Sequence, residues 1–205
     1  VIAHTGAGIN ADDEALKFAV NILRTMINEA ASLSKKLDLR LLTAQIPSDE
    51  ASTRLAKLDV EKYGSSNVVI QGSPDRPYYT DGSILPASLK IPLESRIKLE
   101  GKIQNILESS SLPIYLEPKK FDSENLLKTT KIAQDKGIKF MFYTSDYSYC
   151  FNCSKVFSGI LYKCPSCDTS DLIQIARTEN MFMALTLWAE AKKKDLENRV
   201  CYALS

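Results

Sequence analysis

Hydrophobic residues return every three or four positions over long parts of the chain, which is the pattern of amphipathic helices. The first such segment begins with Asp12, Asp13 and Glu14, and acidic groups favour the positive end of a helix. In a later segment of this kind, residues 122–135, Asp122 stands where an N-cap residue is expected. Helices are therefore expected over residues 12–36, 47–63, 93–107, 122–135 and 181–200.

Shorter apolar runs lie between these helices, and they predict strands over residues 39–46, 112–118 and 138–145. Helix and strand alternate from residue 12 to residue 145, which is typical of an α/β protein with a mostly parallel sheet. Residues 64–90 contain three prolines and three glycines, so a long loop is expected there. Loops of this length are more often functional than idle.

Composition narrows the class of protein only moderately. The chain has 205 residues, 44% hydrophobic and 25% charged, as in an ordinary globular protein, and its formal net charge is +1. A near-neutral charge gives no argument for binding DNA or RNA. No apolar run approaches the length of a membrane span, and no signal-peptide pattern stands at the start. We therefore expect a cytoplasmic protein whose thiols stay reduced.

Four of the five cysteines stand in one segment of nineteen residues, "YCFNCSKVFSGILYKCPSC". They form two C-x-x-C pairs, Cys150 with Cys153 and Cys164 with Cys167, separated by enough chain for a short hairpin. This spacing favours a zinc ribbon that binds one structural Zn²⁺ through four thiolates, with no open coordination position. Redox-active pairs, disulfides and an iron–sulfur centre remain alternatives.

The pattern divides the chain into three expected parts. Residues 1–145 form an α/β domain, residues 146–176 form the zinc ribbon, and residues 177–205 form a C-terminal segment with the last helix. A core of normal size is expected in the first part, so the ribbon is not needed to rescue a small scaffold.

Several motifs occur in an order that resembles a known family. They are "IPSDEASTRLAKLDVEKYG", "PYYTDGSILP", the two cysteine pairs, "ARTENMF" and "WAEAKKKDLENRVCY". Together they resemble the C-terminal region of the anaerobic, class III ribonucleoside-triphosphate reductases. In the last two motifs, the positions that match this family are Arg177, Trp188, Lys192, Leu196 and Arg199.

The resemblance implies a fold and a chemistry. The family is built on a ten-stranded α/β barrel of the glycyl-radical type, of which this chain would be a part. It reduces ribonucleotides to deoxyribonucleotides through a glycyl radical that hands its radical character to a barrel cysteine. A separate S-adenosylmethionine-dependent activase installs the radical. The family's zinc site lies between the barrel and the loop with the radical glycine, so the ribbon would anchor that loop.

The sequence departs from the family's pattern at two requirements of this chemistry. Asn180 stands at the position that aligns with the radical glycine, and no cysteine precedes Cys150. A glycyl radical is planar and stabilised by both neighbouring amides, so a side chain at this position would disturb it. We therefore expect no reduction of nucleotides by this chain alone. It would be either a short, degenerate relative or a C-terminal piece of a longer protein, which the missing initiator Met favours.

Other residues are weaker candidates for substrate binding. Pro47, Ser48 and Asp49 open a helix after an expected strand, where ligands often bind in α/β proteins. Tyr78 and Tyr79 stand in the long loop. A nucleotide is a possible ligand of these groups. The expected partners are a second copy, an upstream reductase chain and the activase. A different class of function also remains open, a zinc-ribbon module that binds a protein partner.

Overall fold

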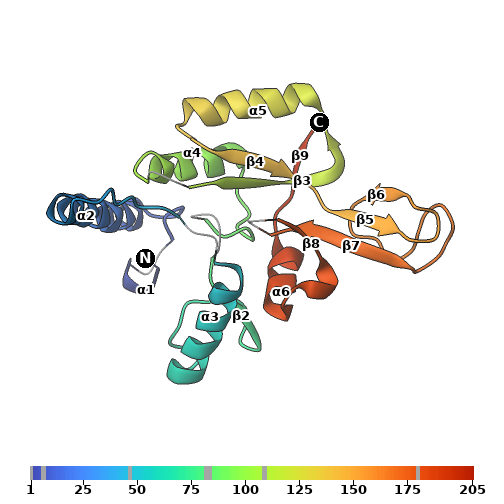
Figure 1. Ribbon diagram of the computed structural model, residues 1–205, viewed down its shortest axis with the longest axis horizontal. Coiled ribbons are helices and arrows are strands. Elements are labelled where there is room, and N and C mark those ends of the chain that lie inside the picture. The colour runs from blue at the N-terminus through green and yellow to red at the C-terminus, as the bar shows by residue number, and fades with distance from the viewer. Residues whose placement is uncertain (1, 6–7, 46–47, 81–84, 108–109, 179–180) are drawn as a thin grey trace.

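The computed structural model describes residues 2–5, 8–45, 48–80, 85–107, 110–178 and 181–205, and Figure 1 shows their arrangement. Two helix starts expected from the sequence are confirmed by their caps. The side chain of Asp12 accepts hydrogen bonds from the backbone of Glu14 and Ala15, and Asp122 accepts one from Asn125. The helices are α1 (Ile2–Thr5), α2 (Asp13–Leu37), α3 (Asp49–Tyr63), α4 (Leu93–Gln104), α5 (Ser123–Asp135) and α6 (Glu190–Asn198), with a 3-10 turn η1 (Leu185–Leu187).

The described strands form three separate sheets. A hairpin pairs β1 with β2, a parallel sheet has the order β4-β3-β9, and an antiparallel sheet has the order β6-β5-β7-β8. The mixed α/β class expected from the sequence is confirmed. The strands are β1 (Gln71–Ser73), β2 (Arg76–Tyr78), β3 (Leu112–Phe121), β4 (Met141–Thr144), β5 (Tyr147–Cys150), β6 (Val156–Ser158), β7 (Leu172–Arg177), β8 (Phe182–Ala184) and β9 (Tyr202–Leu204).

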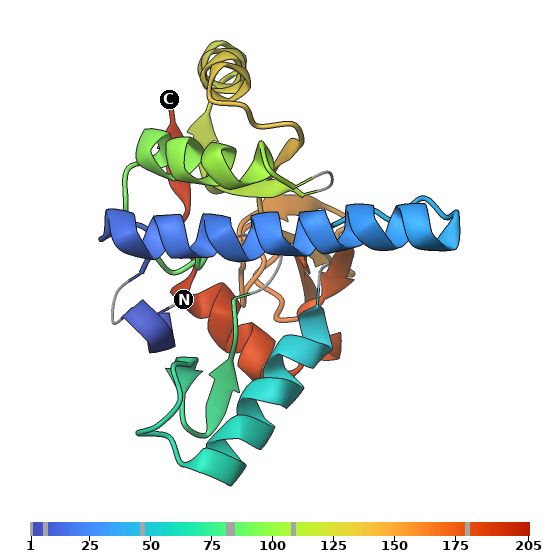
Figure 2. The same cartoon turned by 90° about the vertical axis from the view of Figure 1, so that its left-hand side faces the viewer.

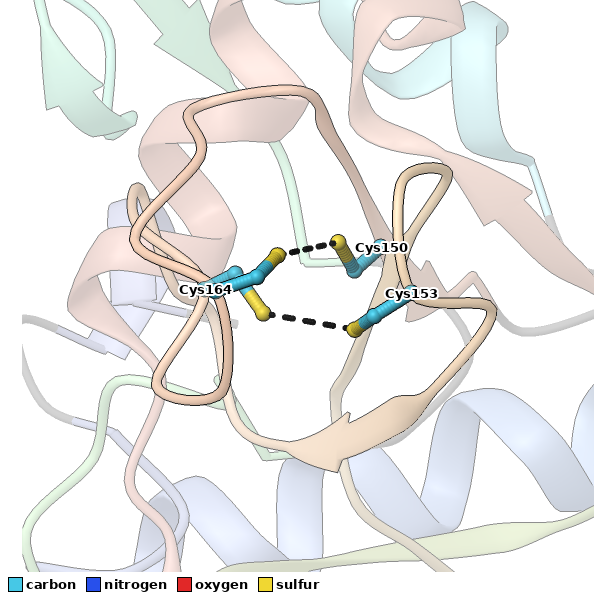
Figure 3. Close-up of side chains that lie close together, drawn as sticks. Cys150, Cys153 and Cys164 are labelled. Atoms are coloured by element: carbon cyan, nitrogen blue, oxygen red, sulfur yellow. Dashed lines mark hydrogen bonds between the residues drawn. The ribbon is translucent and has the colours of Figure 1, made fainter.

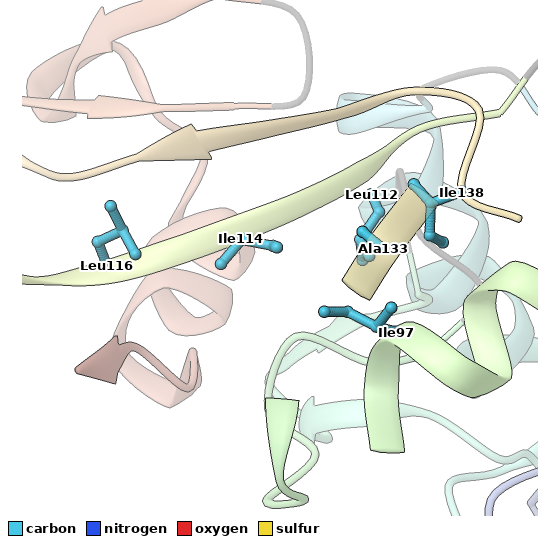
Figure 4. Close-up of a cluster of buried hydrophobic side chains, with 6 residues drawn as sticks. All are labelled: Ile97, Leu112, Ile114, Leu116, Ala133 and Ile138. Carbon is cyan, nitrogen blue, oxygen red and sulfur yellow. The ribbon is translucent and has the colours of Figure 1, made fainter. Parts of the chain in front are cut away.

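The parallel sheet provides the main hydrophobic core. Its central strand β3 is buried from Leu112 to Leu116, and α4 and α5 pack against it through Ile97 and Ala133. Figure 4 shows these side chains together with Ile114 and Ile138. The strand β9 lies beside β3 although the two are far apart in sequence, so the C-terminal segment is joined to the α/β part.

The antiparallel sheet forms a separate ribbon at one side of the molecule (Figure 1). Strand β5 pairs with β6 and with β7, and β7 pairs with β8. Only residues 145–146 separate β4 from β5, so the ribbon is attached directly to the parallel sheet. The position of the ribbon is therefore coupled to the main core.

Helix α2 is the longest element, and Figure 2 shows it running along the side of the molecule. Its first turns pack through Leu16 against Ile103 and Leu107. Its second half has an uncovered apolar side, with Met26 52% and Leu37 54% exposed. None of the helices within the described residues is both long and apolar enough for a membrane crossing.

Two expected elements are wrong within the described residues. Residues 39–45 contain one isolated bridge residue instead of a strand, and Leu39 and Leu42 are exposed because no strand lies beside them. The last helix begins at Glu190 and not near Met181, since residues 182–184 pair with β7. The described residues also form no closed barrel, so the ten-stranded barrel is not confirmed.

Candidate metal centre

The two C-x-x-C pairs converge at one end of the ribbon, as Figure 3 shows. The sulfur of Cys150 lies 3.7 Å from that of Cys167, and the sulfur of Cys153 lies 3.6 Å from that of Cys164. All four sulfurs lie within 4.8 Å of one another. A tetrahedral zinc site with Zn–S bonds of about 2.3 Å has sulfurs about 3.8 Å apart. The four cysteines therefore fit a metal ion of this kind.

The same backbone turn builds both halves of the centre. Ser154 and Asp168 each follow the second cysteine of their pair, and both have φ of 55°. The backbone N–H of the first cysteine closes each turn, from Cys150 to the carbonyl of Lys155 at 3.0 Å and from Cys164 to that of Thr169 at 2.8 Å. Left-handed residues are uncommon outside glycine. Their matching places indicate two equivalent turns, each of which presents two sulfurs.

The thiols are free in the described part of the chain, and their surroundings differ. Hydrogen bonds from the side chain of Asn152 and the backbone of Thr169 lower the pKa of Cys167 to about 6. Burial and the neighbouring sulfurs of Cys150 and Cys164 raise the pKa of Cys153 to about 12. Crowded thiols cannot all ionise without a cation among them, and a divalent metal supplies that charge.

Strand β7 connects the metal centre to the segment that contains Asn180. It begins at Leu172, opposite Cys150, and ends at Arg177. The backbone N–H of Thr178 then donates to the carbonyl of Met181 at 2.9 Å, which closes the β7–β8 hairpin. Asn180 itself lies outside the described residues. The ribbon therefore holds the two strands on either side of this position.

The predicted tyrosine pair lies apart from the cysteines, where β2 meets α3 and α6 (Figure 1). Tyr78 is only 2% exposed, and the amide of Asn198 donates to its hydroxyl at 3.5 Å. The hydroxyl of Tyr79 donates to Asp59 at 2.6 Å, which raises the pKa of Tyr79 to about 12. Both tyrosines are thus engaged in contacts within the chain.

The other predicted binding residues stand at the start of α3. Ser48 is the N-cap residue, although its side chain makes no capping hydrogen bond, and Asp49 is the first residue of the helix. Pro47 lies outside the described residues. Nothing in the described part of the chain brings this helix start to the cysteines.

A pocket of about 580 Å³ lies between the N-terminal residues, α2 and the loop after β2. Its lining is mostly apolar, and Gln71, Tyr79 and Thr80 add polar groups, with the amide of Gln71 donating to the hydroxyl of Thr80 at 2.6 Å. The sequence pattern does not reveal this pocket, because its walls come from segments that are distant in sequence.

A buried group of charged residues was also missed. Lys192, Asp195 and Arg199 are all at least nine-tenths buried, although a lysine-rich helix normally has a solvated face. Burial by itself lowers the pKa of Arg199. Electrostatic interactions with Tyr115, Asp195 and Asp146 outweigh burial and raise this pKa overall. The only signal in the sequence was their spacing of three and four, although Arg199 follows the end of α6 with an extended backbone.

Comparison with known proteins supports the resemblance seen in the sequence. The family model described as anaerobic ribonucleoside-triphosphate reductase matches residues 1–202. A solved structure described as anaerobic ribonucleotide reductase is 19% identical with a TM-score of 0.76, and the match covers 92% of this chain and 29% of that one. No curated protein matches the chain.

Two structures of the anaerobic ribonucleotide reductase from Thermotoga maritima are similar as well. One has glycerol in the active site, with a TM-score of 0.68, 19% identity, and coverage of 90% of this chain and 28% of that one. The other is in complex with dATP and CTP, with a TM-score of 0.69, 20% identity, and coverage of 91% and 28%.

The chain spans less than a third of the length of these solved structures. At such low identity, the structural likeness establishes a shared fold. The family model goes further, because it matches nearly the whole sequence. The chain belongs to the anaerobic ribonucleoside-triphosphate reductase family.

Proposed function

We propose that this chain provides the C-terminal, zinc-binding part of an anaerobic ribonucleoside-triphosphate reductase and is not catalytic by itself. The observation that carries the proposal is the convergence of four cysteine sulfurs near the start of β7, whose other end leads into the β7–β8 hairpin. Cys150, Cys153, Cys164 and Cys167 would hold Zn²⁺ as four thiolates. A zinc ion bound in this way is a structural cross-link without an open position for substrate.

The ribbon would position the hairpin on either side of Asn180. Strand β5 contributes Cys150 and pairs with β7 over its whole length, and β7 runs on to Arg177. A metal that fixes the cysteine end of these strands therefore restricts the hairpin end too. In the family, this hairpin end carries the radical glycine.

The expected absence of catalysis by this chain follows from two features of its sequence. The side chain of Asn180 would disturb a planar radical centre, and no cysteine precedes Cys150 to act as the barrel thiol. In the family, the glycine stores the radical and the barrel cysteine passes it to the substrate. Loss of either one is enough to stop turnover, so both the stored radical and the product are expected to be missing.

Metal analysis tests the structural part of this proposal. Protein purified under reducing conditions should contain about one zinc ion per chain, as expected for a four-thiolate site. Cys164→Ser should lower the zinc content and loosen residues 150–172, while the parallel sheet keeps its own core. Cys201→Ser is the matched control, since Cys201 lies outside the cluster. A disulfide between Cys150 and Cys153 in the purified protein would contradict the proposal.

Radical formation tests the chemical part. After anaerobic incubation with an activase and S-adenosylmethionine, the unmodified chain should give no glycyl-radical signal in electron paramagnetic resonance. Asn180→Gly restores the stabilising geometry at one position but not the barrel thiol. This variant is therefore expected to produce no deoxynucleotide either. A radical doublet from the unmodified chain would show that Asn180 is not the aligned position, and deoxynucleotide production would overturn the proposal.

A second candidate function is a ribbon that binds a protein partner. One observation favours it: Phe151 and Val156 are more than half exposed on the ribbon, and the ring of Tyr149 packs edge-on against Phe151 at 5.2 Å. Exposed apolar groups of this kind are common in interfaces. Retention of an activase or upstream reductase chain by the protein, and its loss in Phe151→Ser, would support this candidate.

A further inference from the structure

Arg199 lies at the junction between the parallel sheet and the ribbon. Its side chain is only 2% exposed. The centre of its guanidinium lies 3.9 Å from the ring centroid of Tyr115 in β3 and 5.9 Å from that of Trp188. Its Nη1 donates to the backbone carbonyl of Arg177 at 3.4 Å. One side chain thus contacts the central strand, the segment before α6 and the end of β7.

Helix α6 supplies the carboxylate that holds Arg199 in this orientation. The Oδ2 atom of Asp195 lies 3.6 Å from Nη2 of Arg199 and 3.7 Å from Nζ of Lys192. The side chain of Lys192 is 8% exposed and that of Asp195 is 12% exposed. A buried cation without such a partner would be strongly destabilising. Asp195 therefore lies beside two buried cations, one from the same helix and one from the residue that follows its end.

The turn end of the β7–β8 hairpin is held from two directions. From one direction, the backbone carbonyl of Arg177 accepts the hydrogen bond from Arg199. From the other, the guanidinium of Arg177 lies 4.3 Å from the ring centroid of Phe142 in β4 and 5.5 Å from that of Phe182 in β8. The next residue, Thr178, already belongs to the closure of the hairpin. Arg199 therefore acts on the last backbone group before that closure.

We propose that Arg199 is a positioning residue that fixes the β7–β8 hairpin against the parallel sheet, with Asp195 orienting its guanidinium. This anchor would act independently of the metal centre, which holds the opposite end of β7. The interest of the position rests on the proposed function, because in the family this hairpin carries the radical glycine. Arginine is required because its planar guanidinium lies over Tyr115 while its rigid fork of N–H donors reaches Arg177 and Asp195. Lysine has N–H donors but no planar face and no fixed fork.

Hydrogen exchange at the backbone amide of Thr178 tests the anchor directly. Arg199→Lys and Arg199→Met should both exchange roughly ten to a hundred times faster there, the loss expected for one charged hydrogen bond. The amide of Leu112, in the core of β3, should keep its protection if the effect is local. Lys193→Met is the matched control, since Lys193 pairs with Glu190 at the surface of the same helix.

The fluorescence of Trp188, the only tryptophan in the chain, gives a second readout. Arg199→Met removes the cation near the indole, and Arg199→Lys replaces the planar guanidinium with a compact ammonium, so the emission should change in both variants and stay constant in Lys193→Met. Asp195→Asn keeps the shape but loses the charge, and it should reproduce part of both effects. Recovery of full protection by Arg199→Lys would overturn the proposal, because charge alone would then suffice.

Zinc content separates this inference from the proposed function. Arg199→Met should retain the zinc content of the unmodified chain, because the cysteines lie at the other end of β7. Faster exchange at Thr178 with unchanged metal supports an independent anchor. Loss of zinc together with the exchange effect would contradict independence, and unchanged exchange at Thr178 would contradict the anchor. A chain without any zinc would refute the proposed metal centre and leave this test intact.

Discussion

Arg96 shows how a single buried side chain can order the end of the long loop, residues 85–91, which forms no helix or strand. Its Nη2 donates to the carbonyls of Pro86 and Leu89 at 2.8 and 3.1 Å, and its Nε donates to the hydroxyl of Tyr202 at 3.0 Å. That hydroxyl in turn donates to the carbonyl of Ile91. Loop carbonyls that would otherwise need water are satisfied by one guanidinium. The long loop is thereby tied to both α4 and β9.

The hydrogen bond between Tyr79 and Asp59 predicts a pH effect. It raises the pKa of Tyr79 from 10.0 to about 12, so the protonated phenol is favoured in the folded protein. Its contribution to stability is therefore complete below pH 10 and is lost as the pH rises towards 12. In an ultraviolet titration, Tyr79→Phe should lose one late-titrating phenol relative to the unmodified chain.

Asp59→Asn is the matched variant for this titration. It removes the charge that favours the protonated phenol, and the pKa of Tyr79 should fall towards its ordinary value. If Tyr79→Phe and the unmodified chain titrate alike, the hydrogen bond does not form in solution.

At the scale of elements, the contact between α4 and α5 depends on a residue without a side chain. A methyl group on Gly101 would lie 2.1 Å from the carbonyl oxygen of Lys136, which caps the end of α5. Gly101→Ala should therefore force the helices apart and lower the free energy of unfolding by about 2 kcal/mol, a typical cost of overpacking. Denaturant unfolding followed by circular dichroism measures this change.

Gly64→Ala provides the comparison. Its φ is 82°, yet the nearest atom to an added methyl group is 3.9 Å away. Only backbone strain is expected there, at about 1 kcal/mol. A smaller loss for Gly101→Ala than for Gly64→Ala would show that the helices adjust to the added methyl group.

Helices with a clear periodicity of hydrophobic residues could be predicted from the sequence, and short strands could not. Helices α2, α3, α4 and α5 lie close to their expected ranges because each has an apolar stripe or a clear cap. Strands β1, β2, β8 and β9 have three residues each, and a segment this short becomes a strand only through its partner. The expected start of the last helix failed for the same reason, since pairing with β7 overrides the local preference.

The candidate site divides in the same way. The convergence of Cys150, Cys153, Cys164 and Cys167 could be foreseen because each pair sits on a tight turn and the insert between them is short. The junction around Arg199 could not, because β3, η1 and α6 meet there only through the fold. Burial of a charged residue depends on such distant neighbours and leaves little trace in its own segment.

At the scale of the whole molecule, the uncovered side of α2 predicts association. Met26, Leu33 and Leu37 follow one another on this side and are all exposed. Exposed apolar surface of this extent usually marks a contact with another chain. Sedimentation should therefore give a mass above the 22.8 kDa of one chain. The mass should grow with protein concentration if a second copy binds, or on addition of an upstream reductase chain if that chain binds.

Leu33→Lys should weaken this association because it places a charge within the apolar side. Asn28→Lys on the opposite side of the same helix adds the same charge and should have little effect. A mass that stays at that of one chain at all concentrations, with no binding of an upstream chain, would count against this prediction.

The pairing of β9 with β3 has a consequence for the order in which the protein folds. The ribbon strands pair mostly with near neighbours in sequence, whereas Leu116 pairs with Tyr202 across the whole ribbon and helix α6. Contacts between distant residues form late because closing a long loop costs entropy. A ribbon already closed by metal would shorten the flexible chain that β9 must bridge. Refolding should therefore be faster when zinc is present from the start than when it is added afterwards.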